Sequence, residues 1–322
     1  MKWMLPLLAI SLVAQEQNLG VDGEPLPQAT KSNWTFHKHF GLGYRYDNQN
    51  FEQIALQESI KIAPRQTIEL ISCAELLWKN VYLRSKMSYG WLVSGDLMFK
   101  TFGTSLPQFS LGSGYTADAA AQIGWRFHFI QSERFGFYFI PSGGYKYSHL
   151  MGSPNGSQKS SLDPSTILIG RFSHSNQQDW FGPYLDLRFK FRFKDVFEAD
   201  FYYEYARPSL RSVFQYELDR YVFNNSGLVL ADLNRTHSVV HGNALRAQIG
   251  GFELKYQTSE GWTFSLHGEG SACWSDTSRT LGKSVVDQYS ASSIAKSETK
   301  INVNTRVHWI QAKGSLFLGY RF

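Results

Sequence analysis

The chain has 322 residues, of which 43% are hydrophobic, 16% aromatic and 18% charged, and its formal net charge is +5. Beyond residue 14 no stretch approaches the roughly 18 consecutive apolar residues of a transmembrane helix, so any crossing of a membrane would have to use strands. The scattered lysines and arginines argue against a nucleic-acid-binding patch, and the two cysteines, Cys73 and Cys273, are too few for a disulfide framework.

The first 33 residues are predicted to lie outside the folded domain. Lys2 precedes an apolar run over residues 3–13, and the small residue Ala14 is followed by polar residues. This pattern is typical of a secretory signal peptide, so we expect residues 1–14 to be removed on export. Residues 15–33 are polar, and we interpret them as a periplasmic lead-in to a single domain over residues 34–322.

A strand pattern starts at Trp34, where apolar and polar residues begin to alternate. The mostly aromatic face carries Trp34, Phe36, Phe40, Leu42, Tyr44 and Tyr46. The polar face carries His37, His39, Arg45 and Asp47. Because an aromatic face recurs on the later strands, we assign it to lipid and the polar face to the interior of a barrel.

Four hairpins with short turns account for the next eight strands. The predicted strand pairs are 66–78 with 81–91, 115–129 with 135–148, 180–193 with 197–207, and 243–257 with 262–274. Aromatic residues are expected to face one another across the second and fourth turns, Phe127 opposite Phe137 and Tyr256 opposite Trp262. Such cross-strand aromatic pairs stabilise a sheet on its lipid-facing side.

The third hairpin has the most specific register. Centring its turn on Asp195 aligns aromatic residues on the outer face, among them Phe193 with Phe197 and Phe189 with Phe201. On the inner face the same register pairs Arg192 with Glu198, Lys190 with Asp200, and Asp186 with Glu204. Two of these three inner pairs are opposite in charge, so one register satisfies both faces of the sheet.

Two later strands are expected to change which residues face inward. Gly250 and Gly251 suggest a bulge in the strand over 243–257. In the last strand, over 302–322, apolar residues occupy the even-numbered positions near the end of the chain and the odd-numbered positions before 310–312. It finishes with Tyr320 and Phe322, which is typical of the closing strand of an outer-membrane barrel and would serve as its assembly signal.

Short and long connections alternate strictly along the chain. The short ones are 79–80, 130–134, 194–196 and 258–261, and the long ones are 48–65, 92–114, 149–179, 208–242 and 275–301. Outer-membrane barrels have short periplasmic turns and long extracellular loops, so we predict an all-β transmembrane antiparallel up-and-down barrel of about ten strands with both termini in the periplasm. One alternative is a strand hairpin over 213–223 and 227–233 that extends above the membrane; the number becomes twelve if this hairpin, or the segment 166–172, enters the bilayer.

The residues expected to face the interior are strongly charged. Those predicted to line it are Arg45, Glu75, Arg84, Lys86, Arg126, Arg188, Lys190, Arg192, Glu198, Asp200 and Glu204. Such side chains can fill and cross-link a narrow barrel as ion pairs, or they can line a wet, weakly anion-preferring passage because bases outnumber acids. His37 and His39 supply only two ligands, so no metal and no other cofactor is expected.

In size, strand number and connection lengths the chain resembles the omptins, which are outer-membrane proteases. Omptins activate water with an Asp pair that faces an Asp–His pair at the outer rim, and the nearest candidates here are Asp96, Asp232 and His237. These residues lack the family's Asp-x-Asp and Asp-x-His spacing. The resemblance therefore covers architecture, and no catalytic residue is carried over.

The ending Tyr320-Arg321-Phe322 and the aromatic strands are also similar to the Protochlamydia outer membrane protein family of chlamydia-like bacteria. This resemblance implies a porin in the outer membrane of a Gram-negative bacterium. Having only two cysteines, the chain differs from the cysteine-rich major envelope proteins of chlamydiae.

Three functions are compatible with these patterns. We expect a porin-like passage for small hydrophilic solutes; the alternatives are a non-conducting structural or adhesin barrel that acts through its extracellular loops, and an omptin-like protease. The balance is against an enzyme. Expected partners are outer-membrane lipid, the barrel assembly machinery, which would read Tyr320 and Phe322, and small solutes or host surface ligands, with no nucleic acid.

Overall fold

The computed structural model describes residues 34–321, except 54–57, 102–103, 106–108, 155–159, 164–166, 195, 225–226, 244 and 291–293. The predicted signal peptide, the lead-in and Phe322 therefore lie outside the described residues. A search of the described part of the chain for a helix long and apolar enough to span a membrane finds none. The strands are β1 (Trp34–Gln53), β2 (Glu58–Trp78), β3 (Val81–Ser94), β4 (Asp96–Thr101), β5 (Thr104–Ser105), β6 (Phe109–Trp125), β7 (Phe127–Gln131), β8 (Phe135–Pro154), β9 (Ser160–Asp163), β10 (Ile167–Phe193), β11 (Phe197–Ala206), β12 (Ser209–Asn224), β13 (Gly227–Gly242), β14 (Arg246–Gln257), β15 (Trp262–Ser290) and β16 (Ile294–Arg321).

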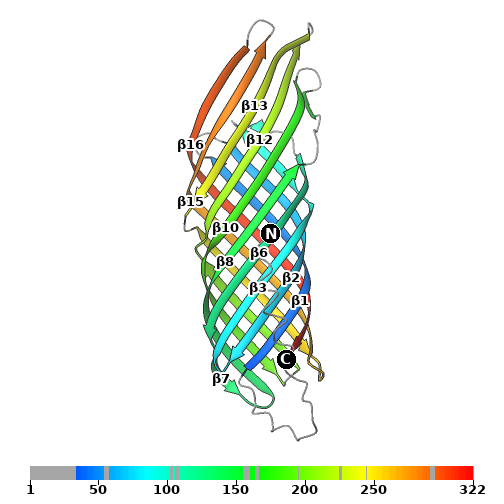
Figure 1. The fold of residues 1–322 in the computed structure, drawn as a ribbon, viewed down its shortest axis with the longest axis vertical. Helices are drawn as coiled ribbons and strands as arrows, with labels where there is room; N and C mark the ends of the chain where they lie inside the picture. Colours follow the sequence, from blue (N-terminus) through cyan, green and yellow to red (C-terminus); the bar gives the residue numbers. More distant parts are fainter. Residues whose placement is uncertain are drawn as a thin grey trace, which may run out of the picture. The chain divides into compact units, whose positions relative to one another are not determined.

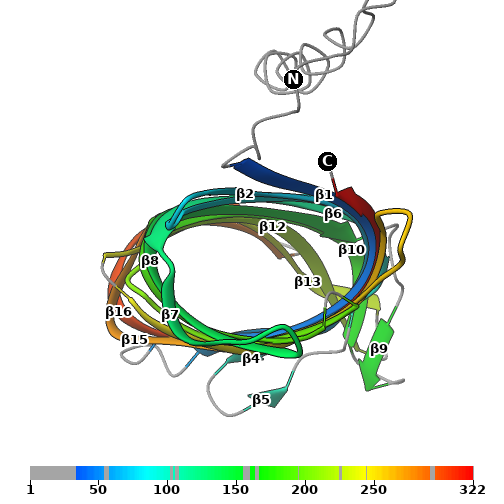
Figure 2. The same ribbon diagram turned by 90° about the horizontal axis from the view of Figure 1, so that it is seen from below.

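Ten strands of one antiparallel sheet close into a ring, and each strand occupies one position around it. Hydrogen-bonded neighbours follow the order β1, β2, β3, β6, β8, β10, β11, β14, β15 and β16, and β16 pairs with β1 to complete the circle. Figure 2 shows this closed wall along its axis. The up-and-down barrel expected from the sequence is confirmed, with ten strands around its wall.

The hairpin of β12 and β13 lengthens two strands of the wall and adds no position to it. β10 pairs with β11 over 184–193 and with β12 over 167–181, while β15 pairs with β14 and, further along, with β13. Arg207 and Pro208 stand between β11 and β12, and the ladder is interrupted there because proline has no N–H to donate. The twelve-stranded alternative is therefore wrong, since the described part of 166–172 also belongs to β10.

Much of what the sequence suggested as long loops is strand. β1 continues to Gln53, β2 begins at Glu58, and β12, β13, β15 and β16 cover most of 208–242 and 275–301. In Figure 1 these last four strands rise together beyond the short-turn half of the wall. Buried and exposed side chains still alternate over 235–241 and 277–281, so the strand pattern continues there although the outer face is no longer apolar.

Two of the predicted hairpin registers are confirmed. The turn at 79–80 pairs Trp78 with Val81 and Glu75 with Arg84. In the third hairpin all the predicted pairs occur, from Phe193 with Phe197 to Asp186 with Glu204. The turn residue Asp195 itself lies outside the described residues.

The other two predicted registers are shifted by two residues. Phe127 pairs with Phe139, because the ladder contains an irregularity between residues 128 and 130. Tyr256 pairs with Phe264, because the connection closes around Gly261, whose φ of 91° is a left-handed conformation that glycine adopts without steric cost. Thr258 N donates to Trp262 O at 2.8 Å, so the loop is three residues long.

Neither expected change of parity occurs. In β14 the odd-numbered residues from Ala247 to Lys255 face inward throughout, and in β16 the odd-numbered residues from Thr305 to Phe317 do the same. The sequence was misleading because Arg306 and His308 are polar yet exposed on the outer face, while the apolar Phe317 is buried inside.

Exposed aromatic residues form two girdles on the outer face. Near the short turns they include Trp34, Trp78, Trp125, Tyr256, Trp262 and Tyr320, and towards the other end Tyr44, Tyr46, Tyr89, Trp91 and Tyr147. Twelve residues separate Trp34 from Tyr46 on β1, and at about 3.3 Å per residue and a tilt of about 40° they span about 30 Å. The belt between the girdles therefore matches the hydrocarbon thickness of a bilayer.

Candidate functional site

The interior of the barrel is where polar side chains converge. Directly opposed residues can be followed from strand to strand around the barrel. Starting at Thr35 on β1, this path returns to β1 at Asp47, so the strands are staggered by 12 residues over one circuit. With ten strands about 4.8 Å apart, that stagger gives a tilt of about 40° and a ring roughly 20 Å across. Long side chains from opposite walls can therefore meet near the axis.

A first layer of ion pairs crosses the lumen towards the short-turn end. Glu75 on β2 lies 3.0 Å from Lys255 and 3.4 Å from Arg84. Arg84 Nη2 also lies 3.2 Å from Glu253 Oε2. Because β3 and β14 are five positions apart in a ring of ten, the Arg84–Glu253 pair joins opposite walls.

The same layer continues on β10 and β11. Arg188 Nη1 lies 3.2 Å from Asp200 Oδ2, and both side chains are fully buried. Lys190 Nζ lies 3.6 Å from Asp200 and 3.4 Å from Glu198. Lys190 also reaches Glu75 at 3.8 Å, so the two halves of the layer are connected across the lumen.

A second layer surrounds Arg45 on β1. Its guanidinium lies 2.7 Å from Asp47, 2.9 Å from Asp118 and 3.3 Å from Glu69. Lys313 Nζ on β16 lies 2.6 Å from Asp118. Three carboxylates and two cations from four strands are therefore paired in a site where Arg45 has no exposed surface.

Further charged side chains pair between these layers. Lys146 is paired with Glu204, and Lys86 Nζ lies 3.6 Å from Glu269. The hydroxyl of Tyr202 donates a 2.9 Å hydrogen bond to Glu269.

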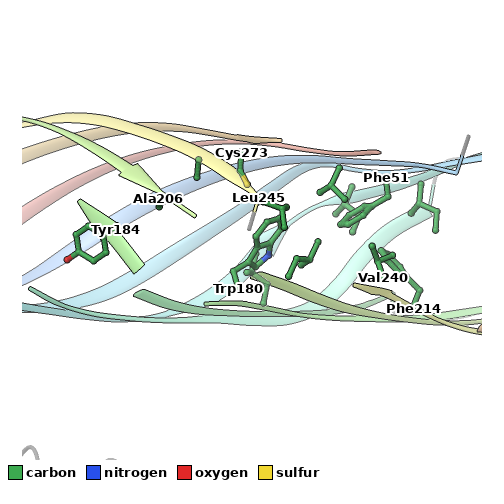
Figure 3. Close-up of a cluster of buried hydrophobic side chains, with 14 of the residues drawn as sticks. Phe51, Trp180, Tyr184, Ala206, Phe214, Val240, Leu245 and Cys273 are labelled. Carbon is green, nitrogen blue, oxygen red and sulfur yellow. The ribbon is translucent and has the colours of Figure 1, made fainter. Parts of the chain in front are cut away.

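An apolar collar lies in the interior beyond the second layer. Trp180 and Trp309 stack with ring centroids 4.6 Å apart, and Phe51 meets Phe214 edge-on at 5.0 Å. Figure 3 shows Phe51, Trp180 and Phe214 converging from different strands. The other buried members of this cluster include Ile60, Ile62, Leu111, Leu150, Leu210, Val240, Leu245 and Val307.

Two cavities lie inside the barrel. One, of about 150 Å³, is lined by residues that include Arg84, Lys146, Lys313, Trp180 and Trp309, so it lies between the first layer and the collar. The other, of about 220 Å³, lies on the short-turn side of the first layer, and its lining includes Arg126, Tyr138, Lys190, Arg192 and Glu198. The guanidinium carbons of Arg126 and Arg192 lie 5.2 and 5.7 Å from the centroid of the Tyr138 ring.

The structure places all eleven residues predicted to line the interior in these layers and cavities. Five of them are buried, namely Arg45, Glu75, Arg188, Asp200 and Glu204. The other six line the two cavities: Arg84, Lys86, Arg126, Lys190, Arg192 and Glu198. Tyr320, predicted as part of the assembly signal, lies near the end of β16 with its ring exposed.

Sequence reasoning missed Lys255, Lys313 and the collar. Lys255 shares its parity with Glu253 and Lys313 shares its parity with the inward Gln311, so uninterrupted alternation would have found both. The collar residues Phe51 and Phe214 lie in segments taken for loops, where the inward position of an aromatic residue was not considered.

The residues nearest to an omptin pattern do not form a site. Asp232 and His237 are five positions apart on β13, and an odd separation on a strand directs side chains to opposite faces. His237 is exposed on the outer face, where its Nδ1 lies 3.0 Å from Gln215 Nε2. Asp96 lies at the start of β4.

Three carboxylates in the first layer come close enough to hold a metal ion. Oxygens of Glu75, Asp200 and Glu253 lie within 4.8 Å of one another. The cations already described, Lys255 and Arg84 among them, contact the same carboxylates. Their charge is therefore balanced by side chains, which fits the expectation of no metal without testing it.

Comparisons with known proteins agree with this architecture. A family model described as Protochlamydia outer membrane protein matches residues 39–322. Among curated proteins, none matches the chain in sequence. Among solved structures, the outer membrane protease OmpT from Escherichia coli has a TM-score of 0.58 at 9% identity, over 89% of this chain and 97% of that chain.

Two further barrels align at lower scores. The toluene transporter TodX of Pseudomonas putida has a TM-score of 0.28 at 7% identity, over 89% of this chain and 90% of that chain. The translocator domain of the autotransporter NalP from Neisseria meningitidis has a TM-score of 0.28 at 10% identity, over 98% of this chain and 95% of that chain. The similarity to OmpT is one of fold alone, and the two lower scores carry no structural argument.

Proposed function

We propose that this chain, which belongs to the Protochlamydia outer membrane protein family, forms a barrel that passes no solutes. It acts through the surface that it displays outside the cell. The protein is an outer-membrane β-barrel, and the family match extends over almost the whole described wall. In this proposal the barrel is a cross-linked support, and the strands that rise beyond the bilayer carry the interaction.

The observation that carries the proposal is the bridging of the lumen at successive levels. Arg84 and Glu253 join opposite walls at 3.2 Å in the first layer. Within the collar, Gln178 on β10 donates a 2.8 Å hydrogen bond to Gln49 on β1, again five positions away in the ring. A solute would have to break these contacts, and the desolvated ion pairs of the first layer are costly to separate.

Displayed strands supply the surface. β12 with β13 and the far halves of β15 and β16 continue the wall beyond the girdle at Tyr44 and Tyr46. They are held together by backbone pairing and by the collar, so they present a sheet and not a set of separate loops. A sheet of this kind offers a broad, fixed face to a partner.

Solute uptake by liposomes tests this function. Liposomes containing the purified barrel are expected to swell in an isotonic solution of a small sugar no faster than liposomes without protein. Swelling at the rate given by a general porin would contradict the proposal. A variant in which Trp180 and Trp309 are both replaced by alanine is the positive control, because it removes the stacked pair of the collar.

A wet, weakly anion-preferring passage is the second candidate, and the two cavities favour it. Their linings contain more bases than acids, and only the first layer and the collar separate them from each other and from the outside. If this candidate holds, planar bilayers carry stepwise currents with anion preference, and Lys190→Glu or Arg192→Glu shifts that preference towards cations.

For assembly we propose recognition of β16 by the barrel assembly machinery. Tyr320 is exposed and follows the outward Leu316 and Leu318 on the same face. Replacing Tyr320 by Asp is expected to lower the amount of folded barrel in the outer membrane, measured as the heat-modifiable band in electrophoresis.

A further inference from the structure

The outer face just beyond the extracellular girdle is basic on one side of the barrel. Five exposed cationic or titratable side chains lie there on β12, β13, β14, β15 and the link between β11 and β12. They are Arg207, Arg211, His241, Arg246 and Arg279, and together they are termed the basic patch. Their neighbours in the chain, such as Leu210, Val240 and Ala247, are buried, so the patch residues face outward.

Strand pairing brings these residues together although they are far apart in sequence. Arg211 is opposite His241, and His241 is opposite Arg279, so three adjacent strands place them in one row. Ala206 is opposite Ala247, which puts Arg207 beside Arg246 in a second row. Directly opposed residues of neighbouring strands are about 5 Å apart, and Figure 1 shows β12, β13 and β15 side by side.

The height of the patch is set by the aromatic residues next to it. Arg207 Nε donates a 3.3 Å hydrogen bond to the hydroxyl of Tyr205, two residues closer to the bilayer. Arg246 is opposite Trp274 on β15. Tyr205 and Trp274 are half-buried, and because tyrosine and tryptophan on the outer face mark the boundary between hydrocarbon and headgroups, the guanidinium groups of Arg207 and Arg246 lie at the level of the outer-leaflet headgroups.

Among the side chains that the structure describes, two carboxylates border the patch, and they are engaged elsewhere or lie at its edge. Asp179, opposite Arg211, is 2.7 Å from His149 Nδ1 and accepts a 2.8 Å hydrogen bond from Tyr147. Glu52 is opposite Arg306 on β16, at the far side of the patch. The patch therefore keeps an excess of positive charge facing the headgroup layer.

We infer that the basic patch binds the phosphate groups of a phosphorylated glycolipid in the outer leaflet. Guanidinium groups pair with phosphate in bidentate geometry, and rows of arginines about 5 Å apart on a fixed sheet can contact a multiply phosphorylated headgroup. The apolar wall below the patch, which includes Phe181 and Tyr203, would lie against the acyl chains.

The test compares two triple variants of the full barrel in detergent, with lipid binding measured by native mass spectrometry. Arg211→Gln/Arg246→Gln/Arg279→Gln removes three charges from the patch. Lys79→Gln/Arg134→Gln/Lys194→Gln removes three exposed charges at the short-turn end and is the matched control. Both variants should keep the heat-modifiable mobility of a folded barrel, since all six residues are exposed.

Bisphosphorylated lipid A is the probe. An arginine near an anionic surface is worth about fivefold in affinity, so the patch variant is expected to bind about a hundredfold more weakly while the control variant binds like the wild type. Lipid A without phosphates should bind weakly to all three proteins. Equal binding by the patch variant and the wild type, or equal binding of the phosphate-free lipid, would overturn the inference.

Two further arms distinguish other sources of the same chemistry. Inorganic phosphate in large molar excess is expected to leave lipid A bound, and its displacement of the lipid would mean that the patch recognises the free anion. Heparin, as a sulfated polysaccharide, is expected to bind more weakly than lipid A. Tighter binding of heparin would assign the patch to an acidic glycan and overturn the lipid inference.

Discussion

Arg45 can stay charged in a site without exposed surface because three carboxylates surround it. Asp47, Glu69 and Asp118 lie within 3.3 Å of its guanidinium, and the indole of Trp309 donates a 2.9 Å hydrogen bond to Asp47. In a buried network of this kind, removing one partner leaves the others uncompensated, which costs far more than the network itself contributes. Single residues therefore carry large effects in this barrel.

Replacing Arg45 by Met is expected to destabilise the folded barrel by about 3–5 kcal/mol, because three buried carboxylates lose their common cation. The measurement is the urea midpoint of unfolding in lipid vesicles. Lys283→Met is the control, since Lys283 pairs with Glu298 at 2.7 Å on the exposed surface outside the bilayer. An unchanged midpoint for Arg45→Met would show that the layer does not support the fold.

The exposed pair Lys283–Glu298 makes a small, pH-dependent contribution to the stability of the fold. The hydrogen bond from Lys283 lowers the pKa of Glu298. A carboxyl group whose pKa is lower in the folded state stabilises the fold above its unfolded pKa, and this contribution is lost as the pH falls through the folded pKa. Because Glu298 is fully exposed, the effect is small.

Two adjacent glycines give a matched pair of substitutions. A Cβ at Gly251 would lie 2.6 Å from the carbonyl oxygen of Gly268 and would overlap the phenol of Tyr202, whereas a Cβ at Gly250 meets nothing within 4 Å. Gly251→Ala is expected to cost about 1–3 kcal/mol, and Gly250→Ala to change the unfolding midpoint little. Equal midpoints for the two variants would contradict the positions assigned to β14.

At the scale of elements, β12 and β13 form the most separable part of the molecule. Arg207 and Pro208 interrupt the strand before β12, and Leu245 N donates a 2.8 Å hydrogen bond to Pro208 O beneath the hairpin. The base of the hairpin belongs to the collar through Phe214 and Val240. Among the described side chains, those of the collar lie on the near side of the pair Gln215–His237.

Shortening the hairpin tests this division. Replacing residues 217–235 by an Asn-Gly turn keeps Phe214 and Val240 and is expected to leave the barrel folded with an unchanged unfolding temperature. Replacing residues 211–241 removes both collar residues and is expected to lower that temperature. If the short deletion prevents folding, the hairpin is part of the barrel's core and not an addition to it.

The same elements explain what the sequence could and could not predict. Where one face is lipid and the other is charged, as between Phe189 and Phe201, the register is fixed by the residues alone. Beyond the bilayer the outer face is no longer apolar, so the sequence suggested a hairpin over 213–233 but did not show that β12 and β13 continue the ladders of β10 and β15. The bulge at Gly250–Gly251 was predicted wrongly because an outward Arg246 at headgroup height was taken for an inward one.

At the scale of the whole molecule, the question is how ten strands and so many charges share one interior. A ring roughly 20 Å across is narrow enough for side chains from opposite walls to meet, and Arg84–Glu253 and Gln178–Gln49 do so. The sequence predicted many of the charges that face inward, although Arg246 was wrongly placed among them and Lys255 was missed. It could not predict whether they meet or line a passage, because that depends on the stagger of the strands, which sets the diameter.

The ionic current through a planar bilayer that contains the wild-type barrel tests the closed interior most directly. Single insertions of the wild type are expected to carry no steady current, while Trp180→Ala/Trp309→Ala, with its collar opened, is expected to show openings. Steady, stepwise conductance from the wild type, unchanged in the double variant, would contradict a lumen closed by its own side chains.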